Sequence, residues 1–94
     1  MKYTKTSLEN LSKNNHDNFT LDSIGIILLD YTTKNNHGNF KIYKFVEEDK
    51  LFGIVIEPQN RQPISFPISI DKVIKILENP KDGESMVQNQ LCTI

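Results

Sequence analysis

The residue types that most often perform acid–base or nucleophilic chemistry are few in this chain and lie far apart. His16 and His37 lie in Asn-rich polar segments, and the single cysteine is Cys92. A nucleophilic site needs a Cys or Ser beside a base that a third group orients. A structural zinc site needs four ligands. Because no such set occurs at short spacing, the sequence does not predict a catalytic centre.

Two further groups could hold a cation or a phosphate, but both lack the required spacing. The acidic run Glu47–Asp49 has neither the alternating ligands nor the glycine of a calcium loop. The glycines are scattered and do not form a phosphate-binding loop; they are Gly25, Gly38, Gly53 and Gly83. We therefore expect a non-enzymatic protein with no metal site and no cofactor.

One short run has the residue types that bind single-stranded nucleic acid. Lys41, Tyr43 and Phe45 alternate with other residues, and side chains two apart on a strand point to the same face. Aromatic rings stack on bases, and lysines neutralise phosphates. Tyr31 and the turn residue Lys34 would extend this surface. Four residues make up this alternative nucleic-acid-binding site: Lys34, Lys41, Tyr43 and Phe45.

The overall composition favours nucleic acid less than protein as a partner. The chain has 11 Lys and Arg against 12 Asp and Glu, a formal net charge of −1, and Arg61 is its single arginine. Its length predicts one domain over residues 1–94. The N-terminal segment has no apolar signal region, and the longest apolar run, Ile26–Leu29, is far too short to span a membrane. We therefore expect a cytoplasmic location without membrane contact.

The hydrophobic pattern predicts the elements that position these residues. Apolar runs predict four strands, at Phe19–Tyr31, Phe40–Glu47, Leu51–Glu57 and within Pro63–Ser69. The apolar period then changes from two to about 3.6. This change predicts a helix over Ile70–Leu77 with Ser69 as its N-cap. The expected fold is α+β, a four-stranded antiparallel meander with a C-terminal helix packed on one face.

The two ends of the chain are mostly polar. Thr6 and Glu9 match a capping box, which predicts a short helix near residues 7–13. Residues 81–94 either form a short packed segment or are disordered. Residues 1–18 and 81–94 are therefore the predicted flexible termini.

The first predicted strand is the expected binding surface. Pro63 and Pro67 protect the last strand from pairing with another chain, whereas the first has no proline or charge between Asp22 and Asp30. Its alternation directs one set of side chains to each face. One set is Ile24, Ile26 and Leu28, and the other is Ile27, Leu29 and Tyr31.

One helix covers only one face of a sheet, so the other face needs a cover. The termini, a second copy of the chain in a dimer, or another protein could provide it. We predict a partner-binding site that consists of Ile27, Leu29, Tyr31 and Tyr43.

These features predict a small non-enzymatic protein–protein interaction or inhibitor module. It would act through a sheet edge and face, by strand addition or by covering its partner. The Asn-, Lys- and Ile-rich composition suggests a bacterial or phage source. By analogy, such a protein would act as a regulatory, immunity, antitoxin or phage counter-defence factor.

Overall fold

The computed structural model describes residues 3–11, 19–32, 38–45, 51–58 and 61–92. Its elements are, in chain order, α1 (Lys5–Glu9), β1 (Thr20–Leu21), β2 (Gly25–Thr32), β3 (Asn39–Phe45), β4 (Phe52–Glu57), β5 (Ile64–Pro67), α2 (Ile70–Glu78) and α3 (Lys81–Cys92). The strands form one sheet in the order β1-β2-β3-β4-β5, with every neighbouring pair antiparallel. This confirms the predicted α+β class and antiparallel sheet, with five strands in place of four.

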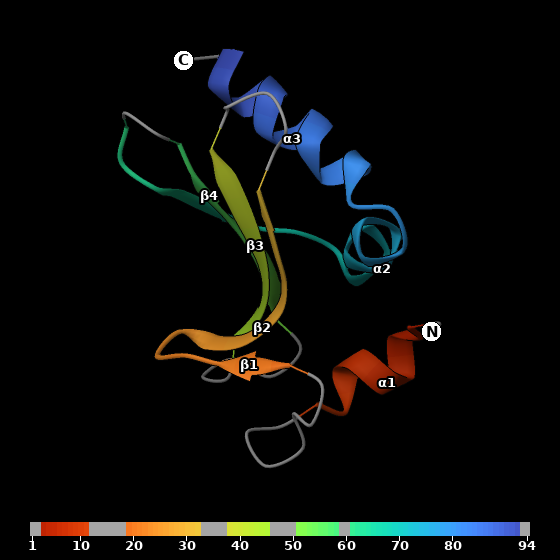
Figure 1. The fold of residues 1–94 in the computed structure, drawn as a ribbon. Helices are drawn as coiled ribbons and strands as arrows, with labels where there is room; N and C mark the ends of the chain where they lie inside the picture. The colour runs from red at the N-terminus through yellow and green to blue at the C-terminus, as the bar shows by residue number, and fades with distance from the viewer. Residues whose placement is uncertain (1–2, 12–18, 33–37, 46–50, 59–60, 93–94) are drawn as a thin grey trace.

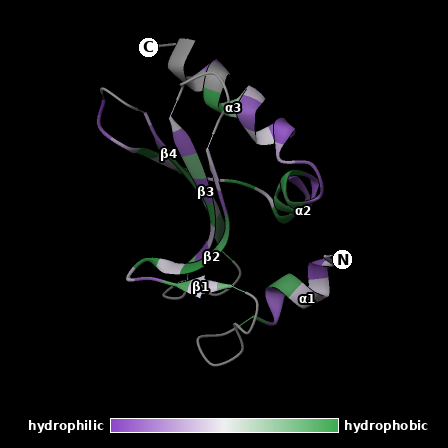
Figure 2. Cartoon of the chain, in the orientation of Figure 1, coloured by the Kyte–Doolittle hydropathy of each residue, from purple (hydrophilic) through white to green (hydrophobic). Residues whose placement is uncertain are grey.

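The helices lie on the same side of the curved sheet (Figure 1). Alternate residues of β3 and β4 face them, and the register pairs Phe40 with Ile56 and Ile42 with Ile54. All four side chains are fully buried. Figure 2 shows hydrophobic residues on α2 and along the neighbouring sheet. The helices contribute further members to the same core, namely Leu8, Val73, Ile76 and Val87.

The predicted change from strand to helix is confirmed. The hydroxyl of Ser69 accepts a hydrogen bond from the amide of Lys72 at 3.3 Å, which caps the start of α2. The apolar spacing then directs Val73 and Ile76 into the core. The helix ends at Glu78, two residues before Pro80, whose ring disfavours a helical conformation for Asn79.

The N-terminal helix begins two residues earlier than its sequence predicts. Its N-cap is Thr4 rather than Thr6, and Ser7 takes the place expected for Glu9. The hydroxyls of Thr4 and Ser7 each accept the other residue's amide at 3.0 Å. A serine at N3 can therefore complete a capping box, and this register buries Leu8.

The first predicted strand is divided by a tight turn. Asp22 Oδ1 accepts hydrogen bonds from the amides of Ile24 and Gly25, at 2.8 and 3.2 Å. The chain reverses there, so β1 pairs with the start of β2. A side chain at Gly25 would collide with the Lys44 carbonyl. The prediction of one strand over Phe19–Tyr31 is wrong because this side-chain-capped turn interrupts it.

The C-terminal segment forms α3, which resolves the alternatives left open for residues 81–92. Val87 is fully buried, and Gly83 lies directly on the ring of Phe40. A methyl group at Gly83 would lie 2.8 Å from Phe40 Cε1 and still closer to Cζ. The absent side chain therefore allows α3 to approach the sheet.

Gly83→Ala should destabilise the protein by about 1–2 kcal/mol, because Phe40 has no room to yield in the core. Helix propensity alone predicts that the same substitution stabilises the protein by about 1 kcal/mol. Urea unfolding should separate these outcomes, with the exposed Ser85→Ala as a control that changes stability by less than about 0.5 kcal/mol. A more stable Gly83→Ala variant would contradict the close packing.

A buried lysine joins the first helix to the sheet. Lys44 faces the helices and is only 5% exposed. Its Nζ donates hydrogen bonds to the carbonyls of Glu9, at 3.2 Å, and Leu11. These carbonyls lie at and just beyond the end of α1, whose last turn has no basic residue of its own. Lys44 thus provides the positive charge that a helix C-terminus favours.

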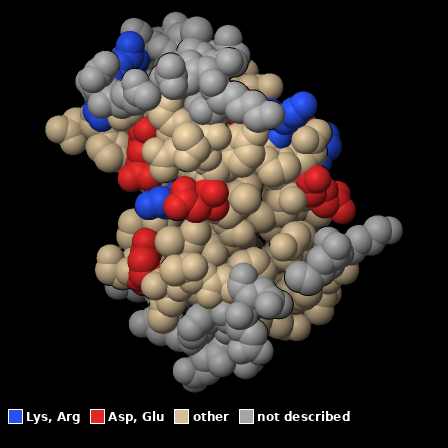
Figure 3. Space-filling model, viewed as in Figure 1, with Lys and Arg blue, Asp and Glu red and all other residues tan. Residues whose placement is uncertain are grey.

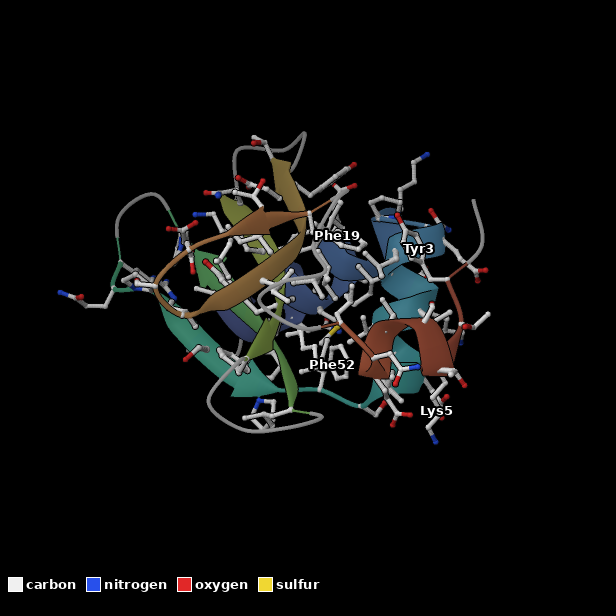
Figure 4. All side chains as sticks on the ribbon, turned by 90° about the horizontal axis from the view of Figure 1, so that it is seen from below. Tyr3, Lys5, Phe19 and Phe52 are labelled. Atoms are coloured by element: carbon white, nitrogen blue, oxygen red, sulfur yellow. The ribbon has the colours of Figure 1, made fainter. Side chains whose placement is uncertain are left out.

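A contact between two aromatic rings also helps to hold the N-terminal helix against the sheet. The centroids of Tyr3 and Phe19 are 6.1 Å apart, with the planes tilted by 40°. Figure 4 shows these two side chains beside each other, with Phe52 in the interior between sheet and helices. The N-terminal helix is therefore held by both aromatic packing and the lysine.

Lys44→Met should loosen α1, because it keeps the aliphatic stem but leaves the two carbonyls without this donor. The expected local cost is about 1–3 kcal/mol. Hydrogen exchange should show faster exchange of the α1 amides, with little change in β3 and β4. The exposed Lys72→Met is the matched control. Unchanged protection of α1 would show that Lys44 does not hold the helix.

Candidate functional site

A β-bulge in β2 separates the residues of the predicted partner-binding site. Ile27 pairs with Tyr43, but Leu29 pairs with Ile42, so Leu28 is an extra residue in the ladder. An extra residue reverses the alternation of all the side chains that follow it. Ile27 therefore lies with Tyr43 on the face away from the helices. Leu29 and Tyr31 lie on the helix-covered face, and the prediction that they share a face with Ile27 is wrong.

Tyr31 is part of the contact between the sheet and α3. It pairs with Phe40, and their ring centroids are 5.3 Å apart. Its hydroxyl donates a hydrogen bond of 3.3 Å to Glu84 Oε2. Burial and the Glu84 carboxylate both raise the pKa of Tyr31. Leu29 also packs against the core, so both residues act in packing on this face.

The predicted free edge is also partly closed. β1 pairs with Ile26 and Ile27 at the start of β2. Further along, the bulge at Leu28 interrupts the ladder, and Asp30 places a charge on the strand. Short edge strands, bulges and charges are features that discourage pairing with another chain. The edge is therefore less open than the sequence predicts, and strand addition here is disfavoured.

The remaining candidate is the face of β2–β5 opposite the helices, which we call the open face. No described helix lies over it (Figure 1). The register aligns its side chains in rows across the sheet. One row is Ile27, Tyr43, Gly53 and Pro67, and the next is Asp30, Lys41, Val55 and Ser65. Phe45 and Glu57 lie beyond these rows, at opposite ends.

An apolar groove occupies one end of the open face. Phe45 stacks on Tyr43 with centroids 5.8 Å apart and planes 10° from parallel. Its ring also lies across Gly53, where a Cβ atom would be 2.5 Å from Phe45 Cε2. The groove has a volume of about 400 Å³ and is lined by Phe45, Leu51, Ser65, Phe66 and Pro67. Gly53 therefore allows the aromatic ring to form one wall.

Tyr43 connects this groove to the β1–β2 turn and is itself only 2% exposed. Its hydroxyl donates a hydrogen bond of 2.7 Å to Asp22 Oδ2. Burial and the Asp22 carboxylate raise the pKa of Tyr43. Burial alone would raise the pKa of Asp22, but hydrogen bonds from Tyr43, Ile24 and Gly25 outweigh it and hold the pKa below its usual value.

The charges of the open face are mostly negative. Lys41 Nζ lies 3.4 Å from Glu57 Oε1, and Asp30 is opposite Lys41 on the neighbouring strand. With Asp22, three carboxylates and one ammonium give this part of the described surface a formal charge of −2. Figure 3 shows, on the side away from the helices, acidic groups with a basic side chain between them and further basic groups above them. The open face is therefore apolar at one end and acidic beside it.

The predicted nucleic-acid site is assembled only in part. Lys41, Tyr43 and Phe45 share the open face, as predicted. Lys34 lies outside the described residues, as do His16, His37 and Glu47–Asp49, and nothing is described of the Cys92 side chain.

The described ranges contain no group of three or more His, Cys, Asp or Glu residues that could hold a metal ion. Within the same ranges, no helix combines the length and hydrophobicity needed to cross a membrane.

Sequence reasoning missed most residues of this site, among them Asp22, Gly53 and Pro67. An Asp followed three positions later by Gly, as in Asp22–Gly25, is a turn signal that could have been recognised. Gly53 within a strand pattern indicates a close approach of another group. The sequence indicates only that Pro67 protects the strand edge, whereas in the structure it also lines the groove.

The geometry defines an α+β protein with a five-stranded antiparallel sheet, and all the helices of its described residues lie on one face of that sheet. Comparisons of the chain with known protein families, curated proteins and solved structures found no match.

Asp22→Asn should destabilise the protein most at neutral pH, by about 1 kcal/mol for a charged acceptor in a partly exposed site. The pKa of Asp22 is lowered in the folded state from 3.8. Its contribution is therefore complete above pH 3.8 and is lost as the pH falls through the folded value. Urea unfolding at a series of pH values should show that the free energies of unfolding of wild type and variant converge as the pH falls through this range.

Tyr43→Phe is the second arm of this test. It removes a hydrogen bond that lowers the pKa of Asp22, so it should weaken the pH dependence. The two substitutions should be non-additive, since they remove the same interaction. Additive effects without pH dependence would contradict the coupling.

Proposed function

We propose that this protein is a non-catalytic protein-binding module that uses the open face of its sheet. The observation that carries the proposal is the groove between Phe45 and Pro67, which no described element covers. Apolar surface with fixed walls and a polar surround is typical of a site for a partner's side chain. Binding there would cover part of the partner's surface and block its other contacts.

The β1–β2 hairpin adds apolar surface beside this face. Leu21 and Ile24 are 39% and 43% exposed and are the large hydrophobic residues most exposed in the described chain. Both flank Asp22, whose side chain orders the turn through the amides of Ile24 and Gly25. An ordered turn loses little conformational entropy on binding, which favours affinity.

The roles that fit such a module are inhibition and regulation of another protein in the cytoplasm, as by an immunity protein, an antitoxin or a phage counter-defence factor. Nucleic acid is the weaker alternative. Tyr43 is almost fully buried, so a base has no ring face to stack on there. Lys41 is paired with Glu57, and phosphates would also approach the carboxylates of Asp22 and Asp30.

Ser65→Tyr should block the groove, because Ser65 is exposed in its lining and the new ring adds bulk without charge. Peptides selected from a random phage-displayed library on the wild-type protein should bind this variant at least about tenfold more weakly, a change of about 1.4 kcal/mol. Fluorescence polarisation of the labelled peptides measures the affinity. The matched control is Ser85→Tyr, on the exposed side of α3, which should bind within about twofold of wild type.

Two outcomes would contradict the proposal. One is a selection that yields no peptide sensitive to Ser65→Tyr. The other is tight binding of a labelled single-stranded oligonucleotide that weakens by orders of magnitude with added salt, since that dependence is the signature of phosphate contacts.

A further inference from the structure

We propose that the partner's contact segment is basic, with an apolar side chain in the Phe45–Pro67 groove and Lys or Arg side chains beside the carboxylates of the open face. This inference rests on the proposed function and names the chemistry of the partner. Its two elements are the groove and the excess of carboxylates on the same surface.

The carboxylates lie on the same side of the sheet as the groove, and hydrogen bonds or an ion pair hold two of them. Asp22 is fixed by Tyr43, and Glu57 by Lys41 and by the Asn39 side-chain amide at 2.9 Å. Asp30 is exposed at the β2 end of the second row. Because Asp22 and Glu57 are held in place, their oxygen acceptors meet an incoming cation at a low entropic cost.

The strand geometry gives the spacing of the partner's residues. Glu57 lies four residues from Gly53 along β4, which is about 13 Å at the rise of a strand. An extended segment that lies along β4 spans that distance with about four of its own residues. The expected pattern is therefore an apolar anchor with a basic residue about four positions away, on the side toward Glu57.

The same carboxylates disfavour a second copy of the chain or a nucleic acid as the molecule bound to the open face. Two copies of the chain packed by their open faces would bring together two sets of the described groups Asp22, Asp30, Glu57 and Lys41. Each set has a formal charge of −2, which opposes association. A phosphate backbone would meet the same repulsion. A basic polypeptide is the occupant that complements both the groove and the charge.

The test uses the peptides selected on the full-length wild-type protein in the experiment above. Those that lose binding to Ser65→Tyr should be enriched in Lys and Arg, and replacing these residues by Glu should weaken binding at least about tenfold at low salt. Asp30→Lys should weaken the same peptides at least about threefold. Glu78→Lys, an acid-to-lysine change on an exposed residue of α2, is the control and should have no effect.

If Asp30→Lys fails to fold, Asp30→Asn serves in its place, since it removes the negative charge without adding a positive one. It should weaken binding in the same direction by a smaller factor. Added salt should reduce the difference between the Lys and Glu forms of each peptide, because screening acts on these exposed charges.

The outcomes separate this inference from the proposed function. Groove-dependent peptides that are neutral or acidic would overturn the inference and leave the protein-binding function standing. A selection without any groove-dependent peptide would overturn both. Light scattering that shows a dimer disrupted by Ser65→Tyr but not by Ser85→Tyr would identify a second copy as the occupant, and would also overturn the inference.

Discussion

One extra residue in β2 determines how the two faces of this sheet are divided. Leu28 has no partner in the ladder, so the side chains after it change faces. Leu29 and Tyr31 consequently pack under the helices, where Tyr31 contacts Phe40 and reaches α3. Ile27 remains on the opposite face with Tyr43. Without the bulge, Leu29 and Tyr31 would lie on the open face and Asp30 would face the helices.

The two described lysines of β3 show how the faces differ electrostatically. Lys44 faces the helices and binds main-chain carbonyls at the end of α1. Lys41 faces away from them and is paired with Glu57. Both charges are satisfied within the protein, although by different groups. The open face thus keeps an excess of carboxylate, and this excess shapes the partner that we propose.

Much of the fold could be predicted from the local pattern. β3, β4, β5 and α2 lie where their apolar periods indicate, because each has one face against a common core. The capping of α2 by Ser69 was likewise visible, since it depends on neighbouring residues. The site was predicted only in part. Lys41, Tyr43 and Phe45 share a face as expected, but the groove also needs Gly53 and Pro67 from two other strands.

The sequence by itself determined the α+β class, the antiparallel meander and the helix after Ser69, because periodicity and capping act over a few neighbouring residues. Tertiary structure alone decided the bulge at Leu28 and the close approach of α3 at Gly83. A bulge leaves a continuous apolar run unchanged in composition, so the run itself gives no sign of which residue is unpaired. Only pairing with β3 and packing against the helices select that residue, and with it the face on which Ile27 and Tyr43 lie.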